Sequence, residues 1–311
     1  MKDYIYSPFN SLSLFGHKKY FSDIIKLYDL NKFPKTSMLS GKKGLGKLTL
    51  ILHFLNYVFN KNNYDIKNNS INKNSKLHDH ISSGSYENII YLSGENHLES
   101  KISNIRELKS KVLKTTINNG PRFIILDDIE LFNANSLNAL LKIIEEPAVN
   151  NYYILINNET KPLIDTIKSR SLETKFFISS KESKIIINQL LSFFNVKNYL
   201  KFDNYQITPG NFVIFNEIIK SNGIIIEKNY VENIILLIKL YKKTKDKNYI
   251  NLSLFIIELS FHKLKDTKDI KIIDLYNNKL DVIKDIDNFL SYNLSTNSII
   301  NNISNKFYDG Q

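Results

Sequence analysis

The sequence predicts an α/β protein, in which a parallel β-sheet domain with helices on both faces precedes two helical domains. Over the first 180 residues, five short β-rich runs alternate with helical patterns, and this alternation is typical of a parallel sheet covered on both faces. Beyond residue 180 the strand signals stop and apolar residues recur at helical spacing. We expect the sheet domain at 1–179, a small helical domain at 180–222 and a helical C-terminal domain at 223–311.

Five runs carry the strand signal, and each is short and rich in β-branched, aromatic or leucine residues. In chain order they are "TSMLS" (36–40), "NIIYLS" (88–93), "FIILDD" (123–128), "YYILIN" (152–157) and "TKFFI" (174–178). Parallel strands need long crossover connections, which are usually helical. The helical patterns between the runs therefore support one parallel sheet.

The helical segments show apolar residues three and four positions apart. This spacing follows Lys47 as far as Phe59, and a second helix runs through "SLNALLKIIEE" until Pro147 ends it. Further helices are predicted at 182–194, 210–221, 230–243, 252–264 and 280–294. By contrast, residues 60–80 are polar, rich in Asn and Lys and without a period, which predicts an exposed insertion.

Composition excludes several classes of protein. The 311 residues contain no cysteine, so disulfides, thiolate zinc sites and cysteine nucleophiles are excluded. The net charge of +11 is typical of proteins with nucleic-acid or acidic partners. Asn, Ile and Lys dominate throughout, however, as in proteins encoded by AT-rich genomes, so the charge identifies no partner by itself. We interpret His78-Asp79-His80 as a solvated loop rather than a metal site, because further ligands at useful spacing are missing.

The chain has no run of about eighteen apolar residues, and its N-terminus lacks a basic stretch followed by an apolar one. We therefore expect a cytoplasmic protein with no membrane contact.

A Gly-rich stretch between the first predicted strand and the following helix, "LSGKKGLGKLTL" (39–50), nearly matches a phosphate-binding loop. Backbone N–H groups of such a loop surround phosphates, and its lysine reaches the terminal ones. Gly41, Gly44, Gly46 and Lys47 provide these elements, but Leu48 replaces the hydroxyl residue that would bind magnesium. Thr49 follows one residue later. The alternative interpretation is an ordinary Gly-rich turn between strand and helix, whose lysine has no role in phosphate binding.

Two further features bear on phosphate chemistry. The run "FIILDD" ends in Asp127-Asp128, where a phosphate-loop NTPase keeps a magnesium-binding acid followed by a carboxylate that polarises water. An apolar run followed by an acid also occurs by chance. In addition, the chain has only three arginines, Arg106, Arg122 and Arg170. Because Lys serves wherever a simple charge suffices, Arg170 in "DTIKSRS" indicates planar contact to phosphate, or a helix-end pair with a local acid.

Three segments, in this order and spacing, resemble the AAA+ clamp-loader subunits of bacterial DNA polymerase III. They are "GKKGLGK", "FIILDDIELFNANSLNALLKIIEEP" and "LINNETKPLIDTIKSRS". The "N-A-L-L-K-x-x-E-E-P" run from Asn138 to Pro147 and the Ser-Arg motif are the most specific parts. The resemblance covers about residues 10 to 180, and "ITPGNF" (207–212) and "FLSYNL" (289–294) resemble the lid and collar regions more weakly.

Within this family the match is closest to the delta-prime class of subunit, because residues that the motor subunits need are replaced. Motor subunits would carry Ser or Thr at 48, Glu at 128, a four-cysteine zinc module, and an arginine where Asn211 stands. The resemblance thus implies little hydrolysis by this chain, while the retained Arg170 would reach into a neighbouring subunit's ATP site. A carboxylate at 128 is Asp, one methylene shorter than Glu.

The resemblance also implies cofactors and partners. The expected cofactor is ATP or ADP with magnesium at a degenerate site, without zinc. The residues of that site are Gly41, Gly44, Gly46, Lys47, Leu48, Thr49, Asp127, Asp128 and Asn157. The implied partners are the gamma/tau and delta subunits and, through the assembled complex, the sliding clamp and primed DNA. Two alternatives stay open, an active motor-type ATPase and a DNA-binding ATPase of a repair or transposition system.

Overall fold

The computed structural model describes residues 6–95, 102–112, 116, 119–200, 207–226, 228–267, 272–292 and 294–308. The side chain of Arg106 and residue 293, on which two of the predictions above fall, lie outside the described residues. The chain divides into two compact units, Met1–Val196 with Tyr205–Val213 and Lys197–Asn204 with Ile214–Gln311.

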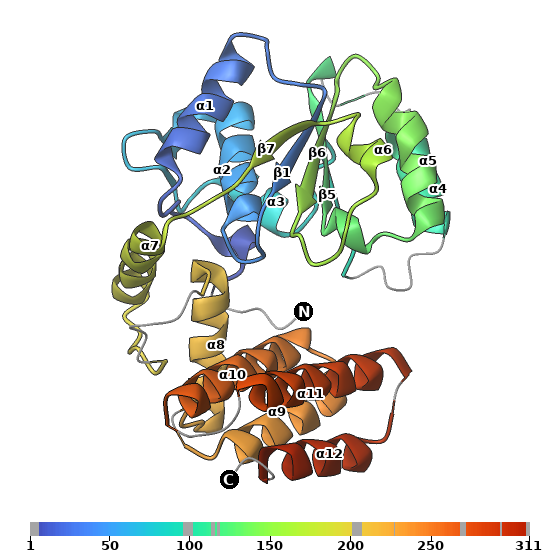
Figure 1. Ribbon diagram of the computed structural model, residues 1–311. Coiled ribbons are helices and arrows are strands. Elements are labelled where there is room, and N and C mark those ends of the chain that lie inside the picture. The colour runs from blue at the N-terminus through green and yellow to red at the C-terminus, as the bar shows by residue number, and fades with distance from the viewer. Residues whose placement is uncertain are drawn as a thin grey trace. The chain divides into compact units, whose positions relative to one another are not determined.

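The first unit is built on one parallel sheet. In the described residues its strands are β1 (Thr36–Ser40), β4 (Ile89–Ser93), β5 (Arg122–Asp127), β6 (Asn151–Asn157) and β7 (Leu172–Lys175). The strand order is β4-β5-β6-β1-β7, and every pair is parallel. The first strand of the chain therefore lies between the last two, and the turn after β1 opens next to the ends of β6 and β7 (Figure 1).

Helices cover both faces of the sheet in this unit (Figure 1). On one face lie α1 (Lys18–Asp29), α2 (Lys47–Phe59) and α3 (Lys76–Ser82), and on the other α4 (Ile102–Val112), α5 (Ala134–Glu145) and α6 (Asp165–Lys168). The unit also contains α7 (Ser180–Phe193) and the first residues of α8 (Pro209–Asn222).

Strand β5 shows why its sequence is apolar without alternation. Phe123 and Ile125 belong to the core with α2, whereas Ile124 and Leu126 belong to the core with α5. All four side chains are fully buried. Both faces of a parallel sheet are covered, so successive side chains are apolar although they point in opposite directions. The predicted α/β fold class, a parallel sheet domain followed by helical segments, is confirmed.

Four of the five predicted strands are confirmed within one residue at their ends, but the last prediction was wrong in its bounds. The run 174–178 was expected to be a strand, and β7 instead covers Leu172–Lys175. Its partner β1 ends at Ser40, which pairs with Lys175. The Phe176 side chain then packs into the core with α2, while Phe177 is exposed. Pairing with β1, rather than local aromatic content, decides where the strand ends.

Residues 60–80 are not the aperiodic exposed insertion that their composition predicted. They form a short 3₁₀ turn, the hairpin of β2 (Tyr64–Asp65) and β3 (Ser70–Ile71), and the start of α3. Tyr64 and Ile71 are buried in the core with α2. His78 to His80 lie in α3 rather than in a loop, because the Ser75 hydroxyl accepts from the His78 N–H and caps that helix. Two well-placed apolar residues are enough to anchor a segment that is otherwise polar.

The second unit is helical in the residues that the structure describes. It contains the remainder of α8, then α9 (Tyr230–Thr244), α10 (Lys247–Thr267), α11 (Ile272–Tyr292) and α12 (Thr296–Tyr308). Helix α9 packs on α10, α10 on α11, α11 on α12, and α12 returns to α9. The predicted helices in this region are confirmed in place, but α10 begins at 247 rather than 252 and α11 at 272 rather than 280, and α12 was not expected. Its Ile299 and Ile303, four residues apart, are buried, and this spacing could have revealed it.

In the part of the chain that the structure describes, every helix is too short or too polar to span a lipid bilayer.

Candidate functional site: the phosphate-type loop, the acidic strand end and Arg170

The Gly-rich loop connects β1 to α2, as the sequence predicted. Gly46, at a φ of 87°, is the residue that precedes α2, and no side chain caps the helix. The first N–H groups of α2 therefore lack a side-chain partner and point toward the loop, which is the arrangement that binds phosphate in other proteins. Gly41 donates its N–H to the Asn157 carbonyl (3.1 Å), which ties the start of the loop to the end of β6.

Lys47 lies in the first turn of α2 and is 3% exposed. Its Nζ donates to the carbonyl oxygens of Gly41 and Lys42, with a distance of 2.9 Å to the latter. Burial lowers the pKa of Lys47 to about 8, although nearby carboxylates, Asp127 first among them, act in the opposite direction. The lysine that would contact a phosphate is thus folded back onto the loop.

The next two positions differ in their surroundings. Leu48 packs against the core on the α2 side of the sheet, and both Leu48 and Thr49 are partly buried. Position 48 contributes to packing and offers no oxygen to a cation.

A segment from far along the chain lies directly on the loop. The Thr208 hydroxyl donates to the Lys43 carbonyl and the Gly210 N–H donates to the Gly44 carbonyl, both at 2.8 Å. A Cβ atom on Gly44 would lie 2.3 Å from Thr208 Oγ1 and 2.9 Å from the Asn211 nitrogen. Gly44 also has a φ of 85°. Only glycine fits here, and Asn211, identified from the sequence, is brought to the loop.

Asp127 is the last residue of β5, and Asp128 follows it at the carboxyl end of the strand. Asp127 Oδ1 accepts from the Asp128 N–H (2.9 Å) and from Asn158 Nδ2 (3.3 Å), and its Oδ2 accepts from the Tyr91 hydroxyl (3.0 Å). Burial and the neighbouring Asp128 raise the pKa of Asp127 to about 6. This carboxylate is therefore enclosed by protein donors.

Asp128 is equally enclosed. Its Oδ1 accepts from Asn158 Nδ2 (2.8 Å) and from Lys43 Nζ (3.5 Å), and its Oδ2 accepts from the Ser93 hydroxyl (3.2 Å). Its φ of 51° is in the left-handed region, which is uncommon outside glycine. The backbone conformation turns this carboxylate back toward the β4 end and the loop.

Several residues of this region were not identified from the sequence. Glu130, 6% exposed, accepts from the backbone N–H groups of Asn158 and Thr160 and from the Thr160 hydroxyl. Only the acid-rich sequence "DDIE" hinted at it. Asn158 follows the identified Asn157, and its amide reaches both acids, whereas the Asn157 amide donates to the Ser40 hydroxyl (3.4 Å). We call Lys43, Lys47, Asp127, Asp128, Glu130 and Asn158 the loop–acid cluster.

His17 also lies at the loop and carries no sequence signal. A Cβ on Gly46 would lie 3.2 Å from His17 Nε2, and the His17 ring stacks at a tilt on Phe176 with centroids 4.6 Å apart. Burial lowers the pKa of His17 to about 4, against a hydrogen bond with the Leu45 backbone. The neutral ring supports the underside of the loop.

Arg170 lies between α6 and β7, and its ion pair and hydrogen bonds are with residues outside the loop–acid cluster. Its Nε forms an ion pair with Glu145 at the end of α5, and its Nη1 donates to the Thr166 carbonyl (3.0 Å). The side chain is 36% exposed and that of Glu145 is 42% exposed. In the single chain, Arg170 therefore pairs with a local acid, which is one of the two roles predicted for it from the sequence.

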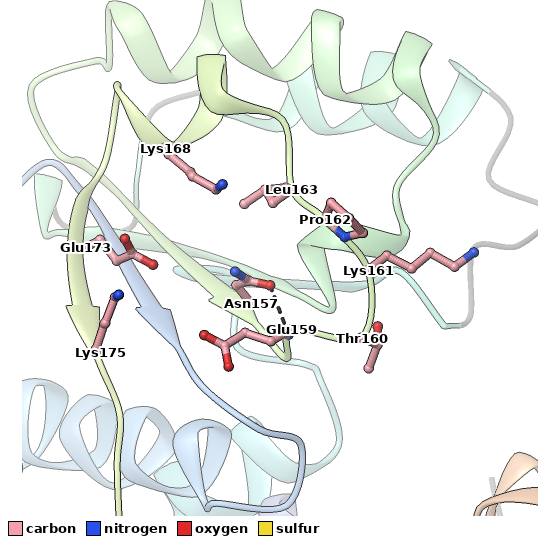
Figure 2. Close-up of a pocket in the computed structure, with 9 residues that line it drawn as sticks. All are labelled: Asn157, Glu159, Thr160, Lys161, Pro162, Leu163, Lys168, Glu173 and Lys175. Atoms are coloured by element: carbon pink, nitrogen blue, oxygen red, sulfur yellow. Dashed lines mark hydrogen bonds between the residues drawn. The ribbon is translucent and has the colours of Figure 1, made fainter. Parts of the chain in front are cut away.

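A hollow of about 450 Å³ lies between the loop that follows β6 and the segment of α6 and β7. Figure 2 shows Asn157 and Glu159 entering it from one side and Lys168, Glu173 and Lys175 from the other, while Lys161 points outward. The identified Asn157 thus lines this hollow, whereas the Gly-rich loop does not.

A magnesium ion at Asp127 and Asp128 is disfavoured, because Lys43 Nζ already pairs with Asp128 and Leu48 offers no hydroxyl ligand. All four of their carboxylate oxygens accept hydrogen bonds from protein donors. Among the described residues, no group of three or more His, Cys, Asp or Glu side chains is placed to hold a metal ion. Each of these oxygens keeps a further lone pair, so what disfavours a divalent ion here is the Lys43 ammonium at Asp128 together with the missing hydroxyl at position 48.

The sheet order, the Gly-rich loop between β1 and α2 and the acidic end of β5 define an α/β domain of the phosphate-loop type. A family model described as "DNA polymerase III, delta subunit" matches residues 16–178, more than half of the 311-residue chain. The chain therefore belongs to this DNA polymerase III clamp-loader family, as the sequence motifs predicted.

Individual relatives carry both the delta-prime and the gamma name. The chain is 24% identical over 275 residues to DNA polymerase III subunit delta' of Buchnera aphidicola from Schizaphis graminum, covering 86% of this chain and 72% of the relative. It is 30% identical over 133 residues to subunit delta' of Bacillus subtilis, covering 43% and 39%. It is 26% identical over 176 residues to subunit gamma of the same Buchnera, covering 56% and 47%.

The chain spans about half the length of the Buchnera gamma subunits that it matches. Among solved structures, it is similar to a DNA polymerase III gamma subunit-related protein of Thermotoga maritima, with a TM-score of 0.47 and 12% identity over 93% of this chain and 99% of that one. The fold assignment does not depend on that similarity, since the strand order and the loop are seen directly.

Proposed function

We propose that this chain is a delta-prime-like, non-motor subunit of a DNA polymerase III clamp loader. It hydrolyses little ATP itself and provides Arg170 to the ATP site of a neighbouring motor subunit. One observation carries the proposal. The residues that would hydrolyse ATP in this chain differ in state from the arginine that would act in a neighbouring subunit. The groups that would activate magnesium and water are replaced or engaged, whereas Arg170 is present and accessible.

The residues at the positions that would hydrolyse ATP in this chain are Leu48, Asp127 and Asp128. Leu48 has no hydroxyl, and both acids accept internal hydrogen bonds that compete with water or a metal ion for their oxygens. Breaking hydrogen bonds to buried carboxylates is costly, on the order of 1.5–3 kcal/mol each. These features support low hydrolysis by the chain alone.

The residue that remains accessible is Arg170. Its ion pair with Glu145 involves two partly exposed side chains, and such pairs contribute only about 0–1 kcal/mol. A phosphate of a neighbouring subunit's nucleotide would therefore compete with Glu145 at little cost, and the planar guanidinium suits bidentate contact with phosphate. The proposal gives the Glu145 pair the role of holding Arg170 in place before assembly.

We extend the proposal to weak nucleotide binding at the Gly-rich loop. The uncapped start of α2 and the ammonium of Lys47 are suited to the phosphates of ATP or ADP, provided that Lys47 exchanges the loop carbonyls for phosphate. Measuring the nucleotide that co-purifies with the chain tests this part. The proposed partners are the gamma/tau and delta subunits, and the clamp and primed DNA through the assembled complex.

The decisive experiment uses the reconstituted complex. The other loader subunits are combined with this chain carrying Arg170→Ala, and ATPase stimulated by clamp and primed DNA is measured. Arginines supplied in trans contribute about 10³ to 10⁵ in rate to phosphoryl transfer, so we expect loss of about 10³ or more at the neighbouring site. Lys168→Ala, which removes a cation two residues earlier, is the matched control and should leave the rate unchanged.

Assembly must be intact for this result to count, and co-purification of the subunits by size exclusion checks it. An unchanged stimulated rate with Arg170→Ala would refute the in-trans role. Steady-state hydrolysis by the isolated chain that is lost with Lys47→Ala would instead favour the active-motor alternative.

A further inference from the structure

The ammonium group of Lys43 contacts the acidic end of the sheet. Lys43 comes from the Gly-rich loop, and its Nζ forms ion pairs with Glu95, which follows β4, and with Asp128, which follows β5 (3.5 Å to the latter). The neighbouring Lys42 has an exposed side chain and forms no ion pair in the part of the chain that the structure describes. Lys43 is thus distinguished from its neighbour by position and not by residue type.

Lys43 joins three chain segments that would otherwise be separate. The loop, the β4 end and the β5 end meet at its Nζ, and the Glu95 N–H donates in turn to the Ser93 hydroxyl (3.2 Å), which donates to Asp128. Divalent cations connect a phosphate loop to an acidic strand end in nucleotide-hydrolysing relatives of this architecture. Here a covalently attached cation makes that connection.

The charge balance at the site requires a cation. Asp127 and Asp128 are adjacent and 8% and 3% exposed, respectively. Two close carboxylates in a dry environment repel each other unless a positive charge offsets them. Burial lowers the pKa of Lys43, but Asp128 and Glu95 outweigh it and raise the pKa above its ordinary value. The Lys43 ammonium is therefore charged at neutral pH and offsets the Asp128 charge, while the Lys47 ammonium lies nearer to Asp127.

We propose that Lys43 is a built-in counter-ion that takes the place of a divalent metal between the Gly-rich loop and Asp128. The acidic end of the sheet is then selective against divalent cations, and it holds the loop in position without metal. Lys43 is the residue that determines this selectivity. The inference concerns the same loop as the proposed function, but it does not depend on whether Arg170 acts in a neighbouring subunit.

Removing the lysine charge tests the proposal directly. Mn²⁺ is titrated into the isolated full-length chain, free of nucleotide, and free Mn²⁺ is followed by its electron paramagnetic resonance signal. Lys43→Gln exposes the acidic pair without its counter-charge, and we expect it to bind one Mn²⁺ at least about tenfold more tightly than the unaltered chain. Lys42→Gln changes the net charge equally and should behave like the unaltered chain.

The new site is assigned by a second substitution. Adding Asp128→Asn to Lys43→Gln removes one of the exposed carboxylates, and we expect Mn²⁺ binding to return to the level of the unaltered chain. Equal Mn²⁺ binding by the Lys43→Gln and Lys42→Gln variants would overturn the proposal, because the gain would then reflect net charge alone. Persistence of the site in the double variant would overturn it as well.

The unaltered chain provides a test that does not depend on how the Lys43→Gln variant folds. If Lys43 already neutralises the acids, the chain should show no Mn²⁺ site that Asp128→Asn removes, and millimolar Mg²⁺ should leave its melting temperature unchanged relative to EDTA. A Mn²⁺ site in the unaltered chain that Asp128→Asn abolishes would refute the counter-ion role. These measurements report metal binding by one chain, so their failure is distinguishable from failure of the Arg170 experiment, which reports ATPase of the complex.

Discussion

The loop–acid cluster and the segment around Arg170 belong to the same unit but satisfy their polar groups differently. In the cluster, Asp127, Asp128 and Glu130 are each less than a tenth exposed, and each accepts several hydrogen bonds from within the chain. Arg170 and Glu145 are more than a third exposed and form one ion pair. The first region is held by its own contacts, and the second keeps its charged groups accessible.

Charged residues therefore have two different roles in this unit. Buried ones hold chain segments together, and exposed ones can change partners. A buried carboxylate that accepts several hydrogen bonds holds the donor segments in position. Losing one of these bonds leaves a buried polar group without a partner, which costs more free energy than losing a solvent-exposed hydrogen bond. An exposed arginine with a weak local partner loses little when it changes partner. One domain can therefore hold one set of charged groups in place and keep another set accessible. Three substitutions test the comparison.

The largest effect is expected where residues 208–211 lie on the Gly-rich loop. Gly44→Ala places a Cβ 2.3 Å from Thr208 Oγ1 and 2.9 Å from the backbone nitrogen of Asn211. Gly84→Ala is the matched control, because Gly84 also has a positive φ (69°) but has nothing within 4 Å of the new Cβ. Both variants share the left-handed strain, so Gly44→Ala should lower the free energy of unfolding by at least about 2 kcal/mol more than the control. Urea unfolding measures the difference, and equal losses would show that the segment does not pack on the loop.

An intermediate effect is expected at Asp127. Burial and Asp128 raise the pKa of Asp127 to about 6, above the unfolded value near 3.9. Between these values the folded chain binds more protons than the unfolded chain, so this carboxyl lowers stability as pH rises from about 4 to 6. Asp127→Asn keeps an acceptor for the Asp128 N–H and removes the titration.

We therefore expect Asp127→Asn to be about 1 kcal/mol or more stable than the unaltered chain at pH 7, with the gain vanishing near pH 4. Thermal unfolding across this pH range measures it, with the exposed Asp165→Asn as a control that should change little. A variant that loses stability at pH 7 would mean that the charged form of Asp127 is needed within the cluster.

The smallest effect is expected in the Arg170 segment. Glu145→Gln removes the ion pair with Arg170, and both side chains are more than a third exposed. The free energy of unfolding should fall by less than about 0.5 kcal/mol, as for other exposed pairs. Urea midpoints of the two proteins measure this change. A loss above about 1.5 kcal/mol would show that the pair is structural, and the contrast between the two regions would not hold.

Much of the fold follows from local patterns. The strand β1 and the loop after it, the apolar run of β5 and the end of α5 before Pro147 are all visible in the sequence, because buried parallel strands are continuously apolar and helices repeat every three to four residues. The bounds of β7 and the hairpin within 60–80 are not visible, since strand β1 and the core under α2 decide them.

The candidate site shows the same division. The sequence alone determined which chemical groups exist: the Gly-rich loop, two acids at a strand end, no hydroxyl at position 48, and one arginine among lysines at position 170. Only the tertiary structure decided how these groups are used. It brought Thr208 and Gly210 onto the loop, Asn158 and Tyr91 onto the acids, and Lys43 rather than Lys42 to Asp128. Hydrogen bonds and ion pairs between residues far apart in the chain depend on where the sheet places its strand ends, and no local pattern records those distances.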